Sequence, residues 1–147
     1  MRLAARSSTE RRGFVGLASG TFQGITAAAP LDLWLAGDTG HARATLLRAH
    51  PVLDDGRLRV SRLGRVLVNA SAEGQRWWAL RGVLRIAAAV FVDTARTASR
   101  LEGPALRDID AGLGARLAAT GLPGTFRADL GKGVNDGDFT FSLTYVP

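Results

Sequence analysis

The chain has 147 residues, about the length of one domain, and its 46% hydrophobic content with no cysteine excludes a wholly disordered chain, a disulfide framework and a thiolate metal site. Its net charge of +6 rests on 18 arginines and one lysine. Guanidinium groups are weakly hydrated and bind carboxylates in a fixed forked geometry, so the excess of arginine over lysine indicates structured ion pairs. The alternative explanation of this excess is codon bias. The two histidines, His41 and His50, are too few for a metal cluster without carboxylate help, so neither a metal nor a cofactor is expected.

Residues 1–36 are expected to hold strands. Residues 14–26 are glycine-spaced and compatible with a strand, and residues 2–8 form a second candidate strand. Glycine and polar residues interrupt the apolar stretch of residues 14–29, so no signal peptide is predicted in the chain shown. No part of the sequence reaches the roughly 18 consecutive apolar residues of a membrane-spanning helix.

Residues 37–64 form an irregular stretch that we expect to be one long loop. Gly37, Pro51 and Gly56 punctuate it, and residues 46–51 lie at its centre. A long segment without strong periodicity inside a β protein is more often functional than idle.

Residues 65–147 are predicted to form five consecutive antiparallel strands, because apolar and polar positions alternate with a period of two. The strands are centred on residues 66–78, 84–93, 109–117, 126–130 and 139–145. Turn-forming residues occupy 121–124 and 135–138, and residues 97–107 are expected to form a longer loop. The fold class predicted is therefore all-β, as an antiparallel meander of six to seven strands.

The polar faces of these strands mix arginine and aspartate with glycine. The charged set is Arg85, Asp93, Asp110, Arg116, Arg127 and Asp129. In a soluble sandwich such faces would meet water, whereas in a transmembrane β-barrel they would line a polar lumen in which opposite charges pair. The aromatic residues Trp77, Trp78, Phe139 and Tyr145 suit the interfacial belts of a membrane protein. The alternation alone leaves both classes open.

Three segments of the chain occur in a distinctive order. They are residues 47–51, residues 89–95, and residues 110–130 followed by the aromatic strand 139–145. In this order they resemble the inward-folded loop, the Phe-x-Asp-x-Gly strand and the last three strands of the bacterial surface antigen (BamA-like) family of outer-membrane β-barrel proteins. Ala49 and Ala95 stand where the two family motifs usually have glycine.

The resemblance implies that Arg48, flanked in the loop motif by His50 and Pro51, points into the barrel lumen. By motif position its partners would be Glu73, Phe91 and Asp93. A guanidinium group in a confined lumen is stabilised by a bidentate contact with a carboxylate and by the face of an aromatic ring. The remaining lumen charges, which are Arg85, Asp110, Arg116, Arg127 and Asp129, would pair across strands. The alternative is that Arg48 is an exposed loop arginine.

The resemblance also implies a role. The expected function is that of an outer-membrane protein that inserts polypeptides into the membrane or passes them across it, with membrane lipid and substrate polypeptides as partners. Six or seven strands cannot close a barrel of the width that the family implies. We therefore expect an incomplete barrel that is part of a longer precursor, or one whose open edges pair with another copy.

Two other functions have weaker support in the sequence. A soluble basic all-β domain that binds nucleic acid or another anionic partner needs a contiguous basic face, whereas the arginines here alternate with aspartates. An enzyme is not expected either. His50, Ser61 and either Asp54 or Asp55 are residue types of a catalytic triad, but the Gly-x-Ser-x-Gly nucleophile motif is missing. Residues 37–40 resemble an aspartic protease motif only superficially.

Overall fold

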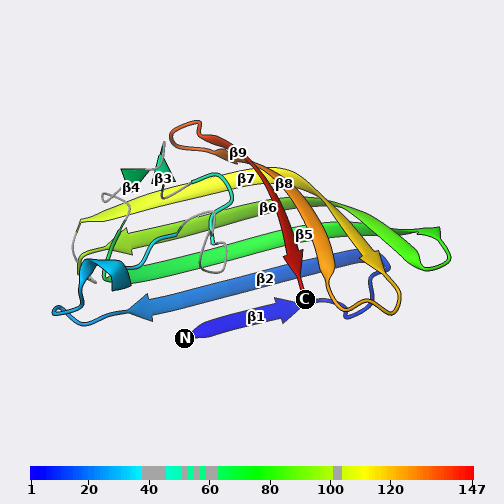
Figure 1. The fold of residues 1–147 in the computed structure, drawn as a ribbon, viewed down its shortest axis with the longest axis horizontal. Helices are drawn as coiled ribbons and strands as arrows, with labels where there is room; N and C mark the ends of the chain where they lie inside the picture. Colours follow the sequence, from blue (N-terminus) through cyan, green and yellow to red (C-terminus); the bar gives the residue numbers. More distant parts are fainter. Residues whose placement is uncertain (38–45, 51–52, 55–56, 59–62, 101–103) are drawn as a thin grey trace.

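Seven strands form a single antiparallel sheet in the order β1-β2-β5-β6-β7-β8-β9 (Figure 1). The computed structural model describes residues 1–37, 46–50, 53–54, 57–58, 63–100 and 104–147. The strands are β1 Arg2–Arg6, β2 Gly13–Gly24, β5 Val66–Arg81, β6 Leu84–Ala98, β7 Ala105–Ala119, β8 Thr125–Gly133 and β9 Phe139–Val146. The long connection between β2 and β5 contains a 3-10 helix, η1 Leu31–Leu33, and a two-stranded ribbon of β3 Leu53–Asp54 and β4 Arg57–Leu58.

The predicted all-β meander is confirmed, and the seven strands of the sheet match the upper end of the expected number. The sheet is not closed into a barrel, so β1 and β9 form its two edges. Two strands fall within residues 1–36 and five within residues 65–147. Within the described ranges, no helix is long and apolar enough to cross a membrane.

The three central strands are longer than the sequence pattern indicated. β5, β6 and β7 contain 16, 15 and 15 residues. The prediction of a loop over residues 97–107 is wrong at the two ends of that range, because Thr97 pairs with Leu106 and Ala98 with Ala105 in the antiparallel ladder, and only residues 99–104 connect the two strands. Backbone pairing continues there although the side chains no longer alternate clearly between apolar and polar.

One connection of the sheet is much longer than the others, and it lies at the end opposite to that of residues 7–12, 82–83 and 120–124 (Figure 1). At one end, residues 7–12, 82–83 and 120–124 make short turns, and β9 also finishes there. The opposite end carries the long connection between β2 and β5, together with the short connections from β6 to β7 and from β8 to β9. The tightest turn joins β5 to β6 through two residues, the first of which is Gly82 at a φ of 42°. Glycine adopts this left-handed conformation without steric cost.

The two faces of the sheet differ in both burial and polarity. We call the face that residues 46–50 cover the inner face and the opposite face the outer face. On β6, the inner-face residue Asp93 is 1% exposed, whereas its outer-face neighbour Val92 is 50% exposed. On β7, Asp110 is 0% exposed and Leu113 is 62% exposed. The charged side is therefore the covered one and the apolar side is the open one.

Two small apolar clusters lie on the inner face. Near the short turns Trp77 packs with Val15, Ala87 and Ala118. Toward the long connection the cluster consists of Leu35, Leu47, Leu67 and Ala95, with Ile25 and Leu46 against it. Because Trp77 is only 4% exposed, its predicted place in an outward aromatic belt is wrong, whereas Trp78 lies on the outer face and is 46% exposed.

Candidate functional site

A short piece of the long connection, residues 46–50, lies against the inner face. The Asn69 side chain of β5 donates to the Leu46 carbonyl oxygen at 3.2 Å. The backbone N–H of Ala49 donates to the Asp110 carboxylate of β7, and the Thr140 hydroxyl of β9 donates to the Ala49 carbonyl oxygen at 3.4 Å. Side chains from three strands thus hold this segment in place.

Glycines on the inner face leave room for the segment. A Cβ atom at Gly131 of β8 would lie 3.0 Å from the Arg48 carbonyl carbon and oxygen. A Cβ atom at Gly112 of β7 would lie 2.4 Å from the Phe91 ring. A larger residue at Gly131 would displace the loop backbone, and one at Gly112 would displace the Phe91 ring and the Leu130 backbone, whose oxygen would lie 2.2 Å from the added Cβ.

Arg48 projects from this segment onto the inner face, where its side chain is 10% exposed. Its Nη1 atom lies 2.8 Å from Glu73 Oε2, and its Nε atom lies 3.1 Å from Asp93 Oδ2. The guanidinium carbon lies 3.8 Å from the centre of the Phe91 ring. The structure therefore brings together Arg48 and the three partners expected from the sequence.

Two further arginines complete a balanced cluster. Arg116 lies 2.8 Å from Glu73 and 2.6 Å from Asp129, and Arg127 lies 2.8 Å from Glu73 and 3.5 Å from Asp129. We call Arg48, Arg116, Arg127, Glu73, Asp93 and Asp129 the inner charge cluster. It contains three positive and three negative groups, so its charges cancel, as stable burial of ions requires.

Neutral side chains extend the cluster along β5. The Ser71 hydroxyl donates to Asp93 at 2.6 Å, and the Gln75 amide donates to Glu73 at 2.6 Å. The Trp77 indole N–H then donates to the Gln75 side-chain oxygen at 2.7 Å. These hydrogen bonds fix the orientation of the acceptor oxygens that receive the arginines.

The remaining predicted site residues have other roles or positions. Asp110 binds the loop backbone and the His50 ring rather than an arginine. Arg85 lies nearer the short turns, where it donates to the Arg11 carbonyl oxygen at 2.9 Å, outside the inner charge cluster. Pro51 falls outside the residues that the structure describes.

The arrangement is suited to positioning the loop. Glu73 meets three guanidinium groups at once, and the aromatic face under Arg48 adds a cation–π contact. The cluster borders a cavity of about 400 Å³ whose other walls include Arg2 and Arg6 of β1 and Ser19 and Thr21 of β2. A cavity with both polar and apolar walls thus lies beside a loop held by ion pairs.

No protein-family model matches the chain, and searches of curated proteins and of solved structures find no significant match.

Proposed function

We propose that this chain forms part of the wall of an outer-membrane β-barrel that inserts or passes other polypeptides. In this proposal the outer face meets lipid, and residues 46–50 lie in the lumen. The observation that carries the proposal is the reversed polarity of the sheet. Buried charges on one face and exposed valine, leucine and phenylalanine on the other are the opposite of a soluble sheet, but they match the alternation of membrane barrels.

The composition of the outer face supports contact with lipid. Its large exposed apolar residues include Phe14, Trp78, Val90, Leu113, Phe126 and Leu143. A contiguous apolar surface of this kind is rare on soluble monomers. β5 to β7 also exceed the roughly 9–11 residues that a tilted strand needs to cross a bilayer.

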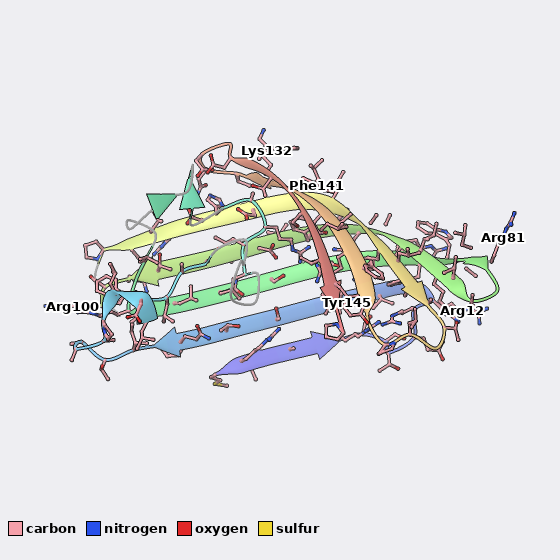
Figure 2. The ribbon with its side chains drawn as sticks, in the orientation of Figure 1. Arg12, Arg81, Arg100, Lys132, Phe141 and Tyr145 are labelled. Atoms are coloured by element: carbon pink, nitrogen blue, oxygen red, sulfur yellow. The ribbon has the colours of Figure 1, made fainter. Side chains whose placement is uncertain are left out.

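Exposed arginines mark the ends of the sheet. Figure 2 shows Arg12 and Arg81 at the end with the short turns and Arg100 at the opposite end. On the outer face, Arg76 stacks on the ring of Phe14 at 4.4 Å and neighbours Trp78. Long basic side chains beside aromatic rings are typical of the membrane interface, where the charged head reaches water.

The connections suggest an orientation. Bacterial outer-membrane barrels have short turns on the periplasmic side and longer loops outside. The short turns at residues 7–12, 82–83 and 120–124 would therefore face the periplasm. The connection that carries Arg48 would then enter the lumen from the extracellular side of the membrane.

The edges of the sheet need partners under this proposal. An unpaired backbone edge is unfavourable in lipid, because its N–H and C=O groups find no water. β1 and β9 are the edges, and we infer that they pair with further strands or with a second copy of the chain.

The polypeptide-handling role rests on the loop and on the resemblance to the bacterial surface antigen family. Arg48 and its partners hold a segment of the chain beside a cavity that charged side chains help to line. A segment held this way can occlude the lumen and can be displaced when an extended polypeptide offers competing contacts. The proposed role of the inner charge cluster is therefore to keep the loop inside the barrel.

The test uses the full chain refolded into phospholipid vesicles and then fused with a planar bilayer. We expect protection from external protease, heat-modifiable migration in detergent gels, and conducting channels that a urea-denatured outer-membrane polypeptide blocks. Arg48→Ala should raise the time-averaged conductance by releasing the loop, whereas Arg100→Ala, at an exposed turn, should not. The proposal would be overturned if the chain stays monomeric in aqueous buffer and does not bind to the vesicles.

A further inference from the structure

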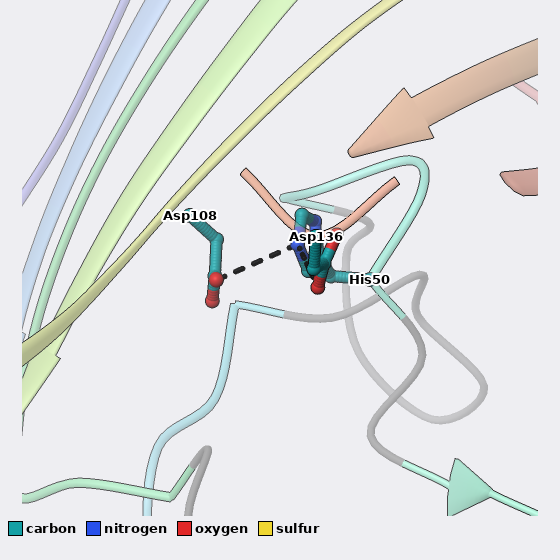
Figure 3. A group of neighbouring side chains, drawn as sticks. All are labelled: His50, Asp108 and Asp136. Carbon is teal, nitrogen blue, oxygen red and sulfur yellow. Dashed lines mark ion pairs between the residues drawn. The ribbon is translucent and has the colours of Figure 1, made fainter. Parts of the chain in front are cut away.

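One cluster of potential metal ligands lies outside the inner charge cluster. His50 Nε2 is 3.1 Å from Asp136 Oδ2 and 3.4 Å from Asp108 Oδ1, and the three ligand atoms all lie within 4.8 Å of one another (Figure 3). The residues come from three separate segments, because His50 follows Arg48 in the loop, Asp108 lies on β7 and Asp136 lies in the turn between β8 and β9.

The histidine is oriented toward the two carboxylates. Its side chain is 0% exposed, and its Nδ1 atom contacts the buried Asp110 carboxylate. The Nε2 atom is buried and has no hydrogen-bond partner of acceptable geometry, although the oxygens of Asp108 and Asp136 are close. A buried ring nitrogen directed at two carboxylates without a hydrogen bond is what a metal-binding histidine presents.

We propose that His50, Asp108 and Asp136 bind a divalent transition-metal ion, with Zn²⁺ as the best fit. One imidazole nitrogen and two carboxylate oxygens are donors that zinc accepts at about 2.0–2.2 Å. Tetrahedral ligands at such distances are about 3.4 Å apart, close to the separations of His50 Nε2 from the two carboxylates. Three protein ligands leave a fourth position for water.

The surroundings of the three ligands fit this proposal. With its proton on Nδ1 donated to Asp110, the ring offers the Nε2 lone pair, which is the usual carboxylate–histidine–metal arrangement. Asp136 Oδ1 accepts a hydrogen bond from the Asp138 backbone N–H at 3.2 Å, and Oδ2 is the oxygen that lies 3.1 Å from His50 Nε2. The Asp136 side chain is 35% exposed, so an ion can enter from solvent.

Gly133 on β8 keeps the site open, since a Cβ atom there would lie 2.3 Å from Asp136 Oδ1 and 2.9 Å from the His50 ring. A metal ion at this place would join the loop, β7 and the turn between β8 and β9. It would therefore fix the loop two residues beyond Arg48. The inference depends only on these residues and stands whether or not the outer face meets lipid.

The test starts from the untagged full chain, from which EDTA has removed bound metal. This chain is titrated calorimetrically with Zn²⁺ and, for comparison, with Ca²⁺ and Mg²⁺. We expect one Zn²⁺ per chain, a rise in Tm on binding, and a loss of affinity of about tenfold or more in Asp108→Asn and Asp136→Asn. Asp138→Asn, in the same turn, is the matched control and should bind as the unaltered chain does.

Absence of zinc binding below millimolar concentration would overturn the inference, since the contacts of His50 with the aspartates would then be structural only. Equal affinity in Asp136→Asn would overturn it as well. Because Asp136 lies in an exposed turn, Asp136→Asn should fold and tests the zinc site even if Asp108→Asn does not fold.

Discussion

The inner charge cluster predicts a large effect for Glu73→Gln. Glu73 accepts close contacts from Arg48, Arg116 and Arg127, each at 2.8 Å. Glutamine keeps the shape of the side chain and can still accept the hydrogen bond from Gln75, but it removes one negative charge. Three guanidinium groups would then face only the carboxylates of Asp93 and Asp129.

The expected magnitude follows from this imbalance. Removing one partner of a buried ion pair costs about 3–5 kcal/mol, because it leaves an uncompensated charge in the interior. The Arg127 side chain is 24% exposed and can turn toward water. We therefore expect the lower end of the range, about 3 kcal/mol. The double variant Glu73→Gln/Arg127→Gln restores the charge balance and should recover part of the loss.

Urea unfolding followed by tryptophan fluorescence measures this loss in free energy of unfolding. Trp77 is a suitable reporter, because it is linked to Glu73 through Gln75 by two hydrogen bonds. Glu10→Gln is the matched control, since Glu10 is exposed in the turn between β1 and β2. If Glu73→Gln and Glu10→Gln have the same small effect, the claim that Glu73 is the centre of the cluster is wrong.

Three further predictions follow from the two faces of the sheet. Val90→Arg on the outer face should lower the stability of the membrane-inserted chain by about 2–4 kcal/mol in vesicle unfolding assays. The control Val90→Ile should leave the stability unchanged. If Val90→Arg has no effect, this face meets water and not lipid. Gly112→Ala should cost about 1–3 kcal/mol, because its Cβ would lie 2.2 Å from the Leu130 carbonyl oxygen and 2.4 Å from the Phe91 ring. Gly74→Ala, with its nearest neighbour at 3.7 Å, is the control expected to change little. A double-mutant cycle of Phe91→Leu with Arg48→Met should give a coupling of about 1–2 kcal/mol in urea unfolding, and additive effects would refute the cation–π contact.

The strands and their faces could be predicted from the sequence because period-two alternation is a local signal. The alternation over residues 84–93 placed Phe91 and Asp93 on one face, and the structure has both on the inner face. The same rule does not say how far a strand continues. β6 extends to Ala98 because its backbone pairs with β7, and that pairing is not visible in the side-chain pattern.

The components of the candidate site were predictable, but their partners were less so. The alternation placed Arg116, Arg127 and Asp129 on the polar face, yet it could not show that both arginines bind Glu73 on β5, which is two strands from β7. Asp108 and Asp136 were not predicted as site residues, because one fell next to an expected loop and the other in a turn. Only the three-dimensional arrangement brings them to His50.

The central claim is that the outer face meets lipid, and tryptophan quenching by brominated phospholipids in vesicles tests it most directly. Two variants, both with Trp34→Phe, keep either Trp77 or Trp78 as the single tryptophan. Trp78 lies on the outer face and Trp77 is buried on the inner face. We predict strong quenching of Trp78 and little quenching of Trp77. Absence of quenching at Trp78, or stronger quenching at Trp77, would contradict the account.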